Sequence, residues 1–138
     1  MKSRIKSIVL LCLLTVSLFT SCSKDTEPTT SSVAGKWKLT NVSGTFAGIN
    51  NDITPGLITW DFNPITQTVT VVNNNPDNGL WDVFETGVYN YHIVTDSEYP
   101  CGEIIRIDNT DMGCFVIEND NFIIDQSVDD GFRLTLKH

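Results

Sequence analysis

Hydrophobic and polar residues alternate in short runs from position 35 to the C-terminus, and residues that favour turns separate the runs. In residues 57–62 (LITWDF) every second side chain is Ile, Trp or Phe, and residues 132–137 (FRLTLK) repeat the pattern with Phe and Leu. Because successive side chains of a strand point to opposite faces, such runs bury one face and expose the other. No window keeps a helical period over three turns, so the pattern predicts an all-β domain.

We expect about eight short strands, joined by turns rich in Asn, Asp, Gly and Pro, in an antiparallel up-and-down meander. Two connections are longer, residues 44–55 and 73–82, and they carry the aromatic residues Phe46 and Trp81. These side chains either pin their loops to the rim or control ligand access at a barrel mouth. The expected strands are Lys36–Ser43, Leu57–Phe62, Thr68–Val72, Val83–Val94, Glu103–Asp108, Cys114–Glu118, Phe122–Asp125 and Phe132–Lys137.

The first 22 residues have a different pattern. Basic residues at positions 2, 4 and 6 precede an apolar run over residues 8–19, which is short for a permanent membrane-spanning helix. The run ends at Thr20-Ser21-Cys22, a junction that resembles the bacterial lipobox, with Phe19 at the usually aliphatic position. The alternative is a plain secretory peptide that happens to contain a cysteine, and either signal would take the chain out of the cytoplasm.

The lipobox resemblance implies cleavage after Ser21 and acylation of Cys22. Each buried methylene of an acyl chain contributes about 0.8 kcal/mol, and two chains suffice for stable anchoring. Residues 1–21 would then be the signal peptide, residues 22–34 the lipidated cysteine with a polar tether, and residues 35–138 the folded domain. Ser23 after the cysteine is compatible with sorting to the outer membrane, where we expect the chain on the periplasmic or the cell-surface face.

The mature chain that this cleavage would leave is strongly acidic. Residues 1–21 hold three of the 9 Lys and Arg and none of the 17 Asp and Glu, which leaves 6 against 17 and a formal net charge of −11. Such a surface disfavours nucleic acid and anionic lipid headgroups, so we expect membrane attachment through the lipid alone. The roughly 105 residues after the tether suffice for one modest core, and we expect a monomer.

The four cysteines divide by position. Cys12 lies in the segment to be cleaved and Cys22 is the acylation site, so Cys101 and Cys114 are left in the domain. Two thiols in an oxidising compartment usually pair, and closing a loop of this length stabilises a fold by roughly 3 kcal/mol in the entropic model. We therefore predict a structural disulfide. No nearby His or third Cys completes a metal site for the pair.

Gly35-Lys36-Trp37, at the start of the first expected strand, resembles the Gly-x-Trp signature of the lipocalins and of small bacterial lipocalin-like lipoproteins. Thr110-Asp111-Met112 resembles the Thr-Asp-Tyr turn of that family. The resemblance implies an eight-stranded barrel that Gly35 and Trp37 help to close, with the first and last strands as antiparallel neighbours. It also implies that Arg133 packs over the Trp37 indole, a cation–π contact worth roughly 0.5–2 kcal/mol.

Three features depart from the lipocalin pattern. The domain is shorter than a typical lipocalin, no C-terminal helix follows the last strand, and Met112 stands where an aromatic residue is expected. A short barrel of eight strands can be filled by its own side chains instead of a ligand. In that reading Trp37 and Arg133 hold the barrel shut.

The sequence contains no recognisable catalytic constellation. It lacks a Gly-x-Ser-x-Gly elbow, HExxH, CxxC and a phosphate-binding glycine loop, and its imidazoles are His92 and His138. Most carboxylates lie in turns, where Asp caps backbone groups, and neither residues 108–111 nor residues 125–130 match an EF-hand loop. We therefore predict no enzymatic activity, no metal and no cofactor.

Aromatic residues are the candidates for lining a ligand site, although core packing explains such residues as well. The sequence predicts a lipid-anchored, lipocalin-like β-barrel that acts as a binding module and holds a small hydrophobic or amphipathic ligand in its mouth. The alternative is a filled barrel that serves as a surface interaction or structural module for a glycan or an envelope protein. An interior cavity would separate the two. The candidate lining residues are Trp60, Phe62, Phe84, Tyr89, Tyr91 and Trp81.

Overall fold

The computed structural model describes residues 32–44, 48–77, 79, 81–126 and 131–138 of the chain. The predicted signal peptide, the acylation site Cys22 and the loop residue Phe46 lie outside the described residues. No helix in the described ranges is long and apolar enough to cross a membrane. The compact unit that extends to the C-terminus comprises residues 31–138.

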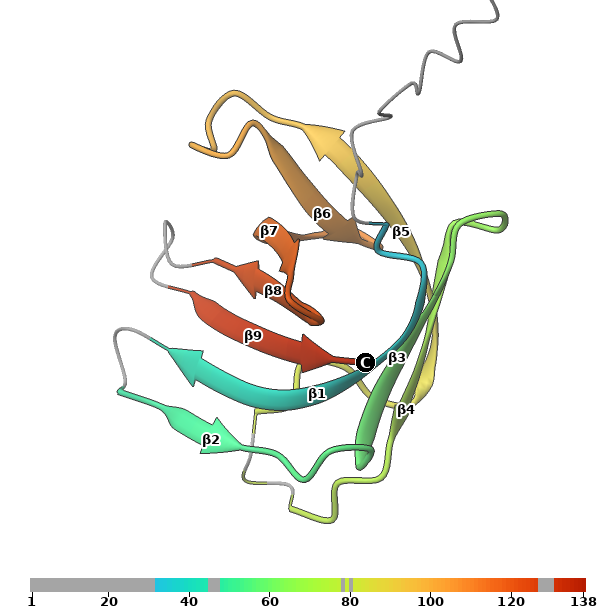
Figure 1. Cartoon of the computed structure of the whole chain (residues 1–138), viewed down its shortest axis with the longest axis vertical. Helices are drawn as coiled ribbons and strands as arrows, with labels where there is room; N and C mark the ends of the chain where they lie inside the picture. Colours follow the sequence, from blue (N-terminus) through green and yellow to red (C-terminus); the bar gives the residue numbers. More distant parts are fainter. Residues whose placement is uncertain (1–31, 45–47, 78, 80, 127–130) are drawn as a thin grey trace, which may run out of the picture. The chain divides into compact units, whose positions relative to one another are not determined.

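The described residues form an all-β fold whose antiparallel strands follow one another as a meander (Figure 1). Strands β1 and β3–β9 close into an eight-stranded barrel because the first and last strands pair, as predicted. The remaining strand, β2, is not part of the closed ring and pairs only with the second half of β1. The strands are β1 (Gly35–Gly44), β2 (Asn50–Asp52), β3 (Ile58–Asn63), β4 (Thr68–Asn73), β5 (Gly87–Thr95), β6 (Glu103–Ile107), β7 (Thr110–Glu118), β8 (Asn121–Asp125) and β9 (Phe132–Lys137).

A β-bulge lets β1 bend as it closes the barrel. The register with β9 shifts between Leu39 and Asn41, so the inward-facing series runs from Trp37 and Leu39 to Val42 and changes parity at Thr40. The Thr40 hydroxyl donates a 3.0 Å hydrogen bond to a β9 carbonyl, and its own carbonyl accepts one from a backbone N–H before β3. The extra residue, Thr40, therefore forms hydrogen bonds with the chain on each side of β1.

Three differences from the expected strands exceed a single residue at an end. Strand β2 (Asn50–Asp52) was missed because its three polar residues have no alternation; Asn41 on β1 holds it by donating to Asn50 and Asp52. Strand β5 begins at Gly87, after a non-strand segment that includes Val83 and Phe84. Strand β7 begins at Thr110, because the β6–β7 connection is a two-residue turn at positions 108–109.

The core lies inside the barrel and consists of the alternating positions that the sequence pattern predicts. Val33 also packs in this core with 9% exposure, so the packed part of the chain begins before Gly35 and includes one residue assigned above to the tether. The buried strand residues of this cluster are Trp37, Leu39, Val42, Ile58, Trp60, Phe62, Val69, Val71, Tyr91, Ile105, Ile107, Met112, Phe122, Ile124, Leu134 and Leu136.

Candidate functional site

Trp37 lies in the interior at the start of β1 and is 1% exposed. Its indole Nε1 donates a 2.8 Å hydrogen bond to the Val33 carbonyl oxygen. The ring packs against Phe122 and stacks on the His138 imidazole, with ring centroids 5.3 Å and 3.7 Å apart. Gly35 opens the strand with a φ of 107°, which glycine adopts without strain. Trp37 thus links the first strand of the barrel to its last two strands.

The predicted packing of Arg133 over Trp37 is wrong. Strand β9 runs antiparallel to β1, and its register places Arg133 opposite Ser43, near the far end of β1. The guanidinium instead lies on the outer face, 3.6 Å from a carboxylate oxygen of Asp125 on β8. The ring stacked on the indole is that of His138, which follows the buried Leu134 and Leu136 at the same two-residue spacing.

Three predicted ligand-lining residues are packed against other side chains in the interior. Trp60, Phe62 and Tyr91 are 0%, 2% and 5% exposed. Phe62 makes edge-to-face contacts with Tyr91 and with Phe122, with ring centroids 5.1 Å and 5.6 Å apart. Burial raises the pKa of the Tyr91 hydroxyl above its usual value. Trp60 has no water-accessible surface and therefore no adjoining void that a water molecule could enter, and Phe62 and Tyr91 have very little such surface.

The Trp60 side chain carries a polar atom without a partner. Its indole Nε1 is buried and makes no hydrogen bond to any described group. The ring packs edge-on against Phe84, with ring centroids 5.5 Å apart. A buried N–H that forgoes its bond to water costs about 1–3 kcal/mol, so this position is a polar defect in an otherwise apolar interior.

The other candidate aromatics lie on or beside the connection between β4 and β5. Phe84 packs partly against the core and contacts Tyr89 on β5, with ring centroids 4.9 Å apart. Trp81 is 39% exposed and stacks on Phe132 at the start of β9, at 3.7 Å. The Asn73 side chain donates to the Asp82 carboxylate at 2.7 Å and to the Phe84 carbonyl at 3.0 Å. These hydrogen bonds tie Asp82 and Phe84 to the end of β4; Phe84 packs on the core, whereas Trp81 stays partly exposed.

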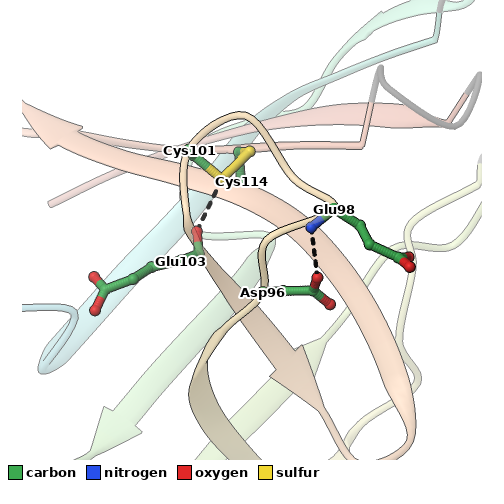
Figure 2. The surroundings of a disulfide bond; sticks show 5 residues. All are labelled: Asp96, Glu98, Cys101, Glu103 and Cys114. Atoms are coloured by element: carbon green, nitrogen blue, oxygen red, sulfur yellow. Dashed lines mark hydrogen bonds between the residues drawn. A yellow bond between two sulfur atoms is a disulfide. The ribbon is translucent and has the colours of Figure 1, made fainter.

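Cys101 and Cys114 form a disulfide with a Cα–Cα distance of 5.9 Å, as predicted. Figure 2 shows the loop before β6 that carries Cys101 to the first half of β7, with Asp96 and Glu98 on the same loop. Cys114 lies opposite Ile104 in the β6–β7 ladder. Ile104 is fully buried, yet its neighbour Ile105 belongs to the interior cluster, so the two point to opposite faces. Ile104 is therefore an apolar side chain buried on the outer face of the barrel, on the same side as Cys114.

An open cavity of about 260 Å³ adjoins this disulfide. It lies over the outer faces of β7, β8 and β9, since Val116, Ile123 and Arg133 alternate there with buried residues of the core. Val116 is 45% exposed and lies beside other apolar groups of the cavity wall. The lining residues are Cys101, Cys114, Phe115, Val116, Ile123, Asp125 and Arg133.

Outside this cavity, several charged side chains form hydrogen bonds with neighbouring groups. Arg106 on β6 is held by two hydrogen bonds to the Asp111 carboxylate, which raise the pKa of the guanidinium further. Asp108 accepts a 2.9 Å hydrogen bond from the Asn90 backbone N–H, and His92 is exposed. Within the described ranges, no three His, Cys, Asp or Glu side chains come together as a metal site.

Comparisons with protein-family models, curated proteins and solved structures found no match. Two places in the structure bear on function, the interior around Trp60 and the outer cavity beside the disulfide. Sequence reasoning missed the cavity, although one signal was present: Val116 and Ile123 occupy outward positions that are polar in most neighbouring strands.

Proposed function

We propose that this chain is a lipid-anchored, non-enzymatic binding module of the cell envelope that binds through the outer surface of a filled, lipocalin-like barrel. The observation that carries the proposal is the burial of the interior. Residues such as Val71, Phe122 and Leu136, which line the interior from different strands, are 0% exposed. Since water cannot touch these side chains, a ligand at this depth would have to displace packed groups.

The anchoring part of the proposal rests on the sequence. The basic, apolar and small-residue segments up to Cys22 resemble a lipoprotein signal, and the acidic mature chain would not bind an anionic membrane by charge. A tethered domain is already concentrated at its surface, so each contact that it makes needs only modest intrinsic affinity. This favours a binding module over a freely diffusing carrier.

One observation favours the second candidate function, an interior site for a small apolar ligand. The Trp60 N–H lies unpaired in the core, and an apolar ligand with a single carbonyl or ether oxygen would supply its missing acceptor. Entry would require Phe84 and its connection to move, because Phe84 packs directly on the indole.

Extraction of the membrane-purified protein separates the two candidates. Organic extraction followed by mass spectrometry should recover no molecule in stoichiometric amount besides the acyl groups on the chain. Trp60→Phe removes the unpaired N–H and should cost less stability than Trp37→Phe, which also breaks the hydrogen bond to Val33. A stoichiometric ligand that Trp60→Phe abolishes would refute the filled-barrel proposal.

Site-specific photo-crosslinking in intact envelopes tests the outer surface itself. A benzophenone side chain at Val116, beside the cavity, should give a defined adduct. The matched control is Val88 on β5, which is 66% exposed and faces outward from a different part of the barrel. Equal adducts at the two positions would show that neither surface is a specific binding face.

A further inference from the structure

We propose that the cavity beside the Cys101–Cys114 disulfide binds a small carboxylate that carries a compact apolar group. The inference rests on the proposed function, because it names the ligand class for a site on the outer surface. Its failure would leave the filled barrel and the outer binding face untouched, since those are tested by extraction and by crosslinking.

The walls of the cavity select an apolar group. Val116 and Ile123 project outward from adjacent strands, and the disulfide closes one side. A volume of about 260 Å³ lies just below the usual range for sites of drug-sized ligands, so it suits a short acyl chain or a single aromatic ring. Burying such a group would cover apolar surface that is now exposed to water.

Arg133 selects the charge. Its side chain is 53% exposed and lies 3.6 Å from Asp125, a separation too long for a hydrogen bond. Arg106 on the same barrel differs, because its guanidinium donates two hydrogen bonds to the Asp111 carboxylate. The Arg133 fork makes no hydrogen bond to a described residue and can donate two parallel bonds to a carboxylate.

Asp125 sets the number of negative charges that the site accepts. Its carboxylate is the only acidic group among the lining residues of the cavity, and it stays close to any anion held by Arg133. A monoanion can share the guanidinium with Asp125, whereas a phosphate dianion would meet stronger repulsion from Asp125 and from the acidic chain as a whole. A neutral alcohol would forgo the charge-assisted hydrogen bonds. The geometry therefore favours a carboxylate over both.

The test titrates the full lipidated chain in nanodiscs with 4-phenylbutyrate, and follows backbone amide shifts by NMR with empty nanodiscs as the blank. Shifts should concentrate at Val116, Ile123 and Arg133. The neutral analogue 4-phenylbutanol and the dianion 4-phenylbutyl phosphate should each bind about tenfold more weakly or worse.

Two charge-removing variants complete the test. Arg133→Gln should weaken 4-phenylbutyrate binding by about tenfold or more, because it removes the donor fork. Lys137→Gln removes the same charge from the same face of β9 but lies outside the cavity, and it should change the affinity by less than about twofold. The proposal is overturned if the two variants weaken binding equally, if the alcohol binds as well as the acid, or if no shifts occur at the cavity.

Discussion

Substituting Gly113 with alanine should break the barrel locally, and a second glycine provides the control. Gly113 on β7 has a φ of 90°, and a Cβ at this position would lie 2.3 Å from the Asp125 carbonyl oxygen. Gly56 also has a φ of 90°, but a Cβ there would meet nothing within 4 Å. Both variants place a side chain in a backbone conformation that side chains disfavour. The difference between their free energies of unfolding therefore measures the close approach of β7 to β8 alone.

The magnitudes follow from these two contributions. A left-handed conformation costs a residue with a Cβ roughly 1–2 kcal/mol, which is the expected loss for Gly56→Ala. Gly113→Ala has the same conformational cost. In addition, its Cβ must displace a backbone carbonyl of the neighbouring strand, which cannot rotate away as a side chain would. Overpacking of this kind adds about 1–3 kcal/mol, so the total should reach about 2–5 kcal/mol.

Urea unfolding followed by tryptophan fluorescence provides the measurement. The midpoint of Gly113→Ala should lie about 1 M below that of Gly56→Ala, given a difference of about 2 kcal/mol and the slopes of about 2 kcal/mol per M usual for small domains in urea. Equal midpoints would refute the reasoning, because they would mean that β7 and β8 separate at negligible cost. A third variant, Gly113→Ser, should behave like the alanine variant, since the clash arises at the Cβ.

The remaining predictions concern closure, crosslink, titration and anchor. Trp37→Ala should cost about 3–5 kcal/mol in urea unfolding, as for other buried aromatic truncations; a loss below about 1 kcal/mol would contradict its role in closure. Reducing Cys101–Cys114, which are 13 residues apart, should lower stability by roughly 3 kcal/mol, and an unchanged midpoint in reductant would count against this. Because burial raises the folded-state pKa of Tyr91 above 10.0, its contribution to the free energy of unfolding is present below pH 10 and is lost as the pH rises beyond it. Tyr91→Phe should therefore make the loss of stability at alkaline pH less steep in urea unfolding. Cys22→Ala should leave an uncleaved, unacylated precursor by intact mass, whereas a normally processed chain would exclude the lipoprotein signal.

The closed barrel was predictable because alternation is a local signal. Ile58, Trp60 and Phe62 follow one another at a spacing of two, and all three are buried as their pattern indicates. Pairing of the first and last strands followed from the resemblance of Gly35-Lys36-Trp37 to a barrel-closing signature. Strand β2 was not predictable, since its order comes from hydrogen bonds to Asn41 and not from any pattern of its own.

The position of Arg133 was not predictable because it depends on register. The resemblance to the lipocalin signature placed Arg133 over Trp37. In the antiparallel β1–β9 ladder Arg133 pairs with Ser43, at the far end of β1, and the place over the indole goes to His138. The β-bulges near Thr40 in β1 and near Gly113 in β7 were not predictable either, because a bulge has only a weak signature in a single sequence.

The Gly113 bulge also explains why the disulfide and the cavity occur together. The extra residue in β7 keeps Cys114 opposite Ile104, within reach of the loop that carries Cys101. The same backbone approach draws Asp125 on β8 against β7, and Asp125 in turn lies beside Arg133 on β9. One close contact thus positions the wall, the acidic neighbour and the basic group of the cavity. Packed interior side chains such as Phe122 and Leu136, both 0% exposed, favour such a site, because they keep the outer faces of three adjacent strands at fixed separations.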